Sequence, residues 1–226
     1  MPPVICLITP PLVRLKPDTT YVASGFSRTV AALVDRIGAA ARAGVHLVQI
    51  RQPGFEARAL TELTAAGVAA VRGTRARVVV NDRLDVALAA GAHGVHLRGD
   101  SMPAARVRGT IGQGFLIGRS VHGVEEARAA AAERAVDYVI YGTVFATDSK
   151  PDARAAGADA LAEICAAVPI PVLAIGGITP ERLGAVAAAG ADGFAAIGLF
   201  AREAPQDLRE IVGRAVRAFD TPAAVP

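Results

Sequence analysis

The residues with the clearest chemical meaning are two adjacent glycines, Gly176 and Gly177, directly after the apolar run Pro171–Ile175. Paired glycines let a backbone turn without a Cβ clash and come close to a ligand. We expect a helix to start at Thr179–Arg182, where unpaired N–H groups and the positive end of the helix dipole favour an anion. Gly198 repeats the pattern after the next apolar run. Together these glycines predict a phosphate site.

Polar side chains also stand at the ends of other apolar runs. Burying a polar group without a partner costs about 2–7 kcal/mol in transfer terms, so each needs a ligand or an internal hydrogen-bond network. Gln49 and Arg51 lie on the same side of a predicted strand, and for both we favour ligand contact. The other candidates are Asn81, Asp82, His96, Ser120, His122, Thr147, Ser149 and Lys150. The last three share a polar, cationic loop that suits a phosphate or substrate clamp, with an ordinary turn as the alternative.

Three of these candidates have competing interpretations. His122 stands where a loop is predicted to enter a helix, which suits a proton-transfer base but also a local structural network. His96 ends a strand and is either a structural barrel residue, which we predict, or a catalyst. Asp82 either binds Mg²⁺ or caps the helix that follows it.

The elements that position these residues alternate regularly along the chain. Eight short apolar runs separated by segments of helical spacing predict a single-domain (β/α)8 barrel, a TIM barrel. A doubly wound open sheet is disfavoured because the first run leads into Thr9-Pro10-Pro11 and not into a glycine-rich loop. The predicted strands are Val4–Thr9, His46–Arg51, Arg77–Asn81, His93–Leu97, Phe115–Gly118, Asp137–Tyr141, Pro171–Ile175 and Gly193–Ile197. The helical segments include Val30–Arg42, Glu56–Val71, Val124–Arg134 and Pro180–Ala189.

The composition along the chain suggests where the barrel begins and ends. We predict that residues 1–220 form the barrel, with an inserted surface loop at 11–28 and a disordered tail at 221–226. The chain has 226 residues, which suits one domain, and its apolar share of 52% excludes a disordered chain.

The charge and the apolar pattern of the chain limit which partners and which cellular compartment we expect. The net charge is only +3 and the basic residues are dispersed, so we expect no nucleic-acid partner. No signal peptide and no run of about 18 apolar residues is evident, so we expect a cytoplasmic protein without a membrane partner. Cys6 and Cys165 lie in apolar runs and are predicted to be core thiols and not a disulfide. The sequence leaves the oligomeric state open, a homodimer included.

Five segments of the chain resemble the thiamine phosphate synthase and thiazole tautomerase family. They are Val45–Arg51, Val78–Gly94, Gly118–Ala127, Asp137–Pro151 and Pro171–Pro180. The resemblance covers nearly the whole chain except 11–28 and the tail, and it implies a (β/α)8 barrel acting on a phosphorylated small molecule, a thiazole phosphate. It further implies that Gly177 and the turn at Gly198 hold the phosphate, while Thr147, Ser149 and Lys150 lie near the pyrophosphate and the substrate.

The family contains two activities. The synthase joins hydroxymethylpyrimidine diphosphate to thiazole phosphate and releases pyrophosphate, using Mg²⁺. The tautomerase moves a proton on a carboxylated dihydrothiazole phosphate and so aromatises the ring, without a cofactor. A third interpretation is a non-catalytic protein that binds thiazole phosphate or thiamine phosphate.

Departures from the synthase pattern favour the tautomerase. The pattern Gln-x-Arg-x-Lys reads Gln49-Ile-Arg51-Gln-Pro53 here, so the lysine that binds diphosphate is missing. Where the synthase pattern has an aspartate that binds the metal, this chain has Ser101, with Asp100 beside it. Where the synthase pattern has a serine near the last strand, this chain has Gly198. A pyrophosphate leaving group needs cations, whereas a proton shift needs only an acid–base group and a fixed substrate.

The sequence therefore predicts a thiazole tautomerase. In this mechanism His122 relays the proton, Arg51 holds the substrate carboxylate, and Gly176, Gly177 and Gly198 hold the phosphate. The alternative is a thiamine phosphate synthase with an altered Mg²⁺ site, in which Asp82 and Asp100 would be the metal ligands.

Overall fold

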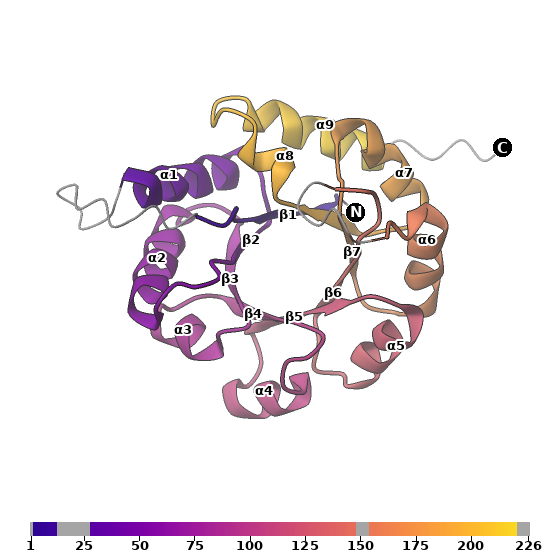
Figure 1. Cartoon of the computed structure of the whole chain (residues 1–226), viewed down its shortest axis with the longest axis horizontal. Coiled ribbons are helices and arrows are strands. Elements are labelled where there is room, and N and C mark those ends of the chain that lie inside the picture. The colour runs from indigo at the N-terminus through magenta and orange to yellow at the C-terminus, as the bar shows by residue number, and fades with distance from the viewer. Residues whose placement is uncertain (1, 13–27, 148–153, 221–226) are drawn as a thin grey trace.

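A computed structural model describes residues 2–12, 28–147 and 154–220 and shows a closed barrel of eight parallel strands, ordered β1 to β8 around the ring (Figure 1). The predicted TIM barrel is therefore confirmed. The strands are β1 Val4–Ile8, β2 Leu47–Ile50, β3 Arg77–Asn81, β4 Gly94–Leu97, β5 Leu116–Val121, β6 Tyr138–Tyr141, β7 Val172–Ile175 and β8 Gly193–Ala196.

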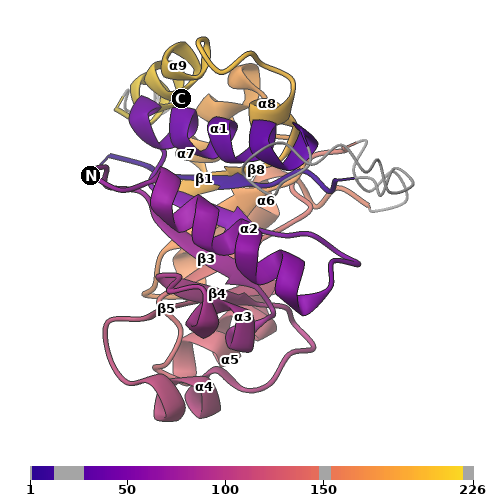
Figure 2. The same ribbon diagram turned by 90° about the vertical axis from the view of Figure 1, so that its left-hand side faces the viewer.

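Helices surround the strands on the outside, as the views in Figures 1 and 2 show. They are α1 Arg28–Ala43, α2 Ala57–Ala70, α3 Leu84–Ala89, α4 Ala104–Ile111, α5 Val124–Ala132, α6 Gly157–Ala167, the 3₁₀ turn η1 Pro180–Arg182, α7 Leu183–Ala188, α8 Gly198–Ala201 and α9 Leu208–Asp220. None of the helices in the described part of the chain is long and apolar enough to cross a membrane.

Alternation along each strand divides the apolar side chains into two clusters. In β1, Ile5 and Leu7 belong to the large cluster that the helices cover, whereas Cys6 and Ile8 belong to a small cluster inside the barrel. This is the twofold periodicity expected of a strand that is buried on both faces. The inward positions of the strands therefore determine which side chains can reach the end of the barrel.

Two predicted elements differ from the structure. The fifth strand does not end at Gly118 but extends to Val121, so Ser120 lies within β5 and not in a loop. The helix expected at Thr179–Arg182 is a three-residue 3₁₀ turn, and the α-helix begins only at Leu183. The rigid geometry of Pro180 suits a turn start, but such a short turn lacks the aligned dipoles of a long helix.

The predicted insertion at 11–28 and the tail at 221–226 fall mostly or wholly outside the described residues, so these boundaries stay predictions. Both cysteines are free thiols. Cys6 is buried inside the barrel, where burial raises the pKa of its thiol, and the half-buried Cys165 lies on α6.

Candidate active site

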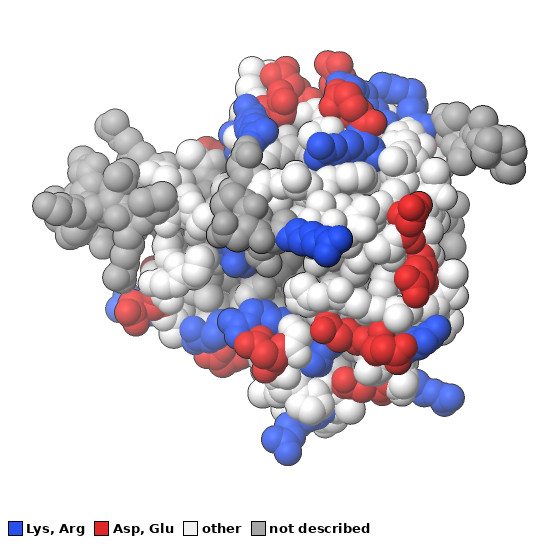
Figure 3. Space-filling model, turned by 45° about the vertical axis from the view of Figure 1, so that its right-hand side comes forward, with Lys and Arg blue, Asp and Glu red and all other residues white. Residues whose placement is uncertain are grey.

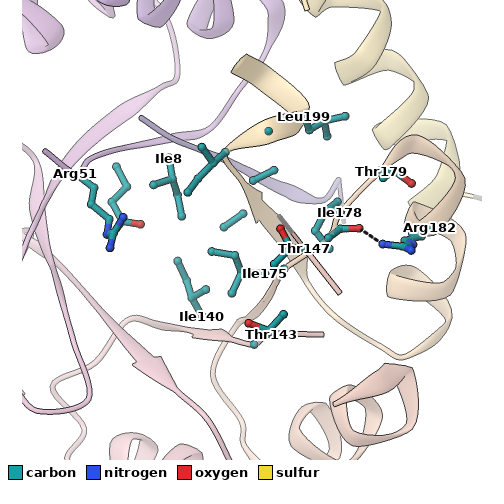
Figure 4. A pocket seen from close by; sticks show the side chains of 18 of the residues that line it. Ile8, Arg51, Ile140, Thr143, Thr147, Ile175, Ile178, Thr179, Arg182 and Leu199 are labelled. Atoms are coloured by element: carbon teal, nitrogen blue, oxygen red, sulfur yellow. Dashed lines mark hydrogen bonds between the residues drawn. The ribbon is translucent and has the colours of Figure 1, made fainter. Parts of the chain in front are cut away.

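A cavity of about 570 Å³ opens at the carboxyl ends of the strands, where the sequence predicts the site. Figure 4 shows its labelled side chains, with Arg51 on one side and Thr179 and Arg182 on the other. Most of the predicted residues line it together: Gln49, Arg51, Asn81, His96, Ser120, His122, Thr147, Gly176, Gly177 and Gly198. Ser149 and Lys150 lie outside the described residues, so their roles remain predictions.

One wall of the cavity is made of buried amides. Gln49 on β2 is only 3% exposed, and its Nε2 donates a hydrogen bond of 2.9 Å to Oδ1 of Asn81 on β3. In the described part of the chain, Gln49 Oε1 is the buried side-chain oxygen or nitrogen that has no hydrogen-bond partner. A buried acceptor left unpaired costs about 1–3 kcal/mol, so this oxygen is suited to receive an N–H group from a ligand.

The opposite wall contains the glycine turn after β7. Gly176 and Gly177 have φ values of +104° and +59°, a region that side-chain-bearing residues rarely adopt. A Cβ atom on Gly177 would collide with the carbonyl oxygen of Ala146. The absence of a Cβ atom therefore lets this turn pack against Ala146 while it lines the cavity. Gly198 begins the four-residue helix α8 and lines the same end of the cavity.

An arginine that sequence reasoning did not select lies beside this turn. Nη1 of Arg182 donates a hydrogen bond of 2.7 Å to the carbonyl oxygen of Gly177 (Figure 4), and its guanidinium carbon lies 5.0 Å from the centre of the Phe145 ring. The hydrogen bond and the cation–π contact fix a positive charge next to the glycines. The Pro-Glu-Arg sequence after the glycines is a weak signal that could have suggested this residue.

His96 on β4 is buried and has hydrogen-bond partners within the barrel, and its structural role stays a prediction. It is 1% exposed; its Nε2 lies 2.9 Å from Ser120 Oγ and its Nδ1 lies 3.3 Å from Tyr138 Oη. Burial lowers the pKa of His96 from its ordinary value to about 3, so the ring is neutral at physiological pH. A neutral imidazole between two hydroxyls orients Ser120 at the cavity wall.

His122 lies at the cavity mouth, just beyond the end of β5. The Glu126 carboxylate accepts a 2.8 Å hydrogen bond from the backbone N–H of His122 and lies 3.3 Å from its Nδ1. The side chain is 57% exposed and lines the cavity, where a ligand can reach it. The predicted helix-entry position is confirmed, whereas the proton-transfer role remains a proposal.

Asp82 does not cap the next helix, which corrects one of its two interpretations. The residue before α3 is Arg83, without a side-chain capping bond, and Asp82 instead accepts a hydrogen bond from Ser101 Oγ. Its other oxygen lies 3.7 Å from Nε of Arg98, which also pairs with Asp100 at 2.6 Å. Within the described residues, no group of three or more His, Cys, Asp or Glu side chains could hold a metal ion. Ser101 and Arg98 already engage the two oxygens of Asp82, and this arrangement does not fit a Mg²⁺ ion at that carboxylate.

A second hollow of about 620 Å³ continues from the cavity mouth, and we call it the side pocket. It shares Arg51, Asn81, Ser120 and His122 with the main cavity and adds Arg98, Asp100, Arg119, Glu126 and Glu133. On the face shown in Figure 3, basic and acidic side chains are interspersed and do not form one basic stripe.

The chain is similar to proteins of one family. Residues 21–200 match the family described as thiamine monophosphate synthase. A thiamine-phosphate synthase from Roseiflexus castenholzii is 45% identical over 73% of this chain and 72% of its own length, and one from Methanoculleus marisnigri is 47% identical over 70% and 75%. Among solved structures, a thiamine phosphate pyrophosphorylase from Pyrococcus furiosus superposes with a TM-score of 0.74 and 31% identity, covering 96% of this chain and 95% of its own.

Proposed function

The chain belongs to the thiamine monophosphate synthase family, and from this premise we propose that it is a thiamine-phosphate synthase. The proposed reaction joins hydroxymethylpyrimidine diphosphate to thiazole phosphate. The thiazole ring nitrogen forms a C–N bond with the pyrimidine methylene carbon. The C–O bond to the diphosphate breaks, and its electron pair leaves with pyrophosphate. The names of the similar proteins support this activity over the tautomerase expected from sequence.

The observation that carries the proposal is the division of the cavity into two unlike walls. The glycine turn with Arg182 suits a phosphate, whereas the unpaired Gln49 oxygen suits an N–H donor. A phosphorylated thiazole supplies the first group, and the amino group of the thiamine pyrimidine supplies the second. A reaction between two different heterocycles needs two such subsites side by side, in an orientation that brings the reacting atoms together.

The chain's own residues supply most of what this reaction needs. In the proposal, Gln49 and Asn81 orient the pyrimidine, while Gly176, Gly177 and Gly198 bind the thiazole phosphate. Negative charge develops on the leaving diphosphate, and cations placed in advance lower the barrier for its departure. Arg51 lines both hollows, and within the described residues its guanidinium has no carboxylate partner. It is therefore the residue we assign to the diphosphate, together with Thr147, which lines the main cavity.

The proposal is tested by incubating the purified protein with thiazole phosphate and hydroxymethylpyrimidine diphosphate. Thiamine phosphate and pyrophosphate should form in equal amounts. Binding of both substrates without product would instead support the non-catalytic interpretation.

The tautomerase remains a second candidate because of the pair formed by His122 and Glu126. A carboxylate 3.3 Å from Nδ1 orients the imidazole and leaves Nε2 to take or give a proton. Arg51 would then hold the substrate carboxylate. Aromatisation of the dihydrothiazole substrate, abolished by His122→Ala, would support this candidate. Its absence in a protein that makes thiamine phosphate would exclude it.

A further inference from the structure

Arg98 lies between two carboxylates at the rim of the side pocket. Its Nε and Nη2 donate hydrogen bonds of 2.9 and 2.6 Å to the two oxygens of Asp100, and its Nε lies 3.7 Å from Asp82 Oδ2. One guanidinium therefore lies against both acidic side chains. Asp82 and Asp100 are the metal ligands predicted for a synthase, and Arg98 lies against both of them.

The remaining oxygen of Asp82 is also engaged. Ser101 Oγ donates a hydrogen bond to Asp82 Oδ1, so both oxygens of this carboxylate face groups of the protein. Mg²⁺ demands near-ideal octahedral oxygen coordination and is usually held by one or two carboxylates together with substrate phosphates. A metal would have to displace a guanidinium from both carboxylates here, and Ser101 offers only a neutral hydroxyl.

The side pocket next to this cluster offers guanidinium groups to an anion. Arg51, Arg98 and Arg119 line it, and so do Asp100, Glu126 and Glu133. Arg119 is balanced by Glu133 at 3.9 Å, and Glu126 is engaged by His122. Planar guanidinium groups match phosphate oxygens in geometry and charge. Arg98 donates to Asp100 through one edge of its guanidinium, and within the described residues its Nη1 makes no hydrogen bond. That nitrogen is free to bind a diphosphate oxygen.

We propose that Arg98 replaces a divalent cation at this site. It offsets one of the two negative charges of Asp82 and Asp100 and, together with Arg51, binds the diphosphate of the pyrimidine substrate, so that the leaving group is bound and released without a metal. The proposal rests on the proposed synthase activity and adds how its leaving group is stabilised. It replaces the Mg²⁺ expected for a synthase by a side chain.

The test is calorimetric binding of inorganic pyrophosphate, measured once in EDTA and once with Mg²⁺. The wild-type protein should bind pyrophosphate equally in both solutions. Arg98→Ala should weaken binding in EDTA by about 10- to 100-fold, because it removes charge-assisted hydrogen bonds. Mg²⁺ should restore part of the affinity of this variant, because Asp82 and Asp100 are then free to bind the ion.

Arg83→Ala is the matched control. Arg83 pairs with Asp85 in the same way, two residues apart, with hydrogen bonds of 2.8 and 2.6 Å, but it lines neither hollow. This variant should bind pyrophosphate like the wild type in both solutions. Three results overturn the proposal: wild-type binding only with Mg²⁺, no binding in either solution, or wild-type affinity of Arg98→Ala in EDTA.

The coupling assay separates this proposal from the proposed function. If thiamine phosphate forms only with Mg²⁺, the role of Arg98 is refuted and the synthase activity stands. If pyrophosphate binds in EDTA through Arg98 but no thiamine phosphate forms under either condition, the anion site stands and the synthase activity is refuted.

Discussion

Replacing Gln49 by methionine should separate ligand binding from stability. Gln49 is 3% exposed and has one hydrogen bond, to Asn81, while its Oε1 has no partner within the described residues. Methionine keeps the volume of the side chain and removes the unpaired oxygen. Removing the buried unpaired oxygen stabilises the folded protein by about 1–3 kcal/mol, and losing the hydrogen bond to Asn81 destabilises it by about 0.5–1.5 kcal/mol. The free energy of unfolding should therefore stay within about 1 kcal/mol of the wild type or rise.

Ligand binding should change in the opposite direction. If the pyrimidine amino group donates to Gln49 Oε1, its loss costs about 1–3 kcal/mol of binding, which is about 5- to 150-fold in the dissociation constant. Urea unfolding measures the first quantity, and calorimetric titration with hydroxymethylpyrimidine diphosphate measures the second.

Gln52→Met is the matched control. Gln52 is also buried, at 6% exposed, but its Oε1 accepts a 2.7 Å bond from Leu12 N–H and its Nε2 donates to Pro10 O at 2.8 Å. This variant should lose about 1–3 kcal/mol of stability because backbone groups lose their partners, and its ligand affinity should not change. The reasoning is refuted if Gln49→Met binds the pyrimidine as tightly as the wild type, or if the two variants lose equal stability.

Three further predictions concern other parts of the site. Arg182→Ala should raise the KM for thiazole phosphate by about 10-fold and should change the KM for the unphosphorylated thiazole little. Arg214 lies on α9, with its Nη2 3.2 Å from Glu181 Oε1, and lines neither hollow, so Arg214→Ala should leave both KM values unchanged. Equal effects of Arg182→Ala on the two thiazoles would contradict a phosphate contact. Gly177→Ala should cost about 1–3 kcal/mol of stability and weaken thiazole phosphate binding, because the backbone φ at this position is +59°. An unchanged free energy of unfolding together with unchanged thiazole phosphate affinity would show that alanine adopts this conformation without strain. The pKa of His96 falls from its ordinary value of 6.5 to about 3 in the folded protein. Its contribution to stability is therefore complete above about pH 6.5 and is lost as the pH falls toward 3, by up to about 1.4 kcal/mol per pH unit. The free energy of unfolding of His96→Gln should depend less on pH across this window, and an unchanged slope would contradict a contribution of His96 to the pH dependence.

The barrel could be predicted from sequence because its strands are short apolar runs that recur between helical segments. Each predicted strand lies within one or two residues of the observed one, except that β5 extends three residues past Gly118. Arg119 and Ser120 are polar and interrupt the apolar pattern, yet β5 pairs with β6 through Val121. Hydrogen bonds to a neighbouring strand outweighed local composition there.

Much of the site could also be predicted, because the carboxyl ends of parallel strands converge at one end of a barrel. This topology brings Gln49, Asn81, His122 and Gly177 to the same cavity although they are far apart in sequence. Contacts between side chains in the loops could not be predicted from the order of the strands. The bridge from Arg98 to Asp82 depends on the left-handed backbone of Asp82, with φ of +59°, and on the loop after β4.

The most direct test of the central claim is one assay of the wild-type protein with thiazole phosphate and hydroxymethylpyrimidine diphosphate, in which thiamine phosphate and pyrophosphate are both quantified over time. The account predicts that the two products accumulate in a one-to-one ratio. Absence of thiamine phosphate, from folded protein that binds both substrates and with Mg²⁺ also supplied, would contradict it.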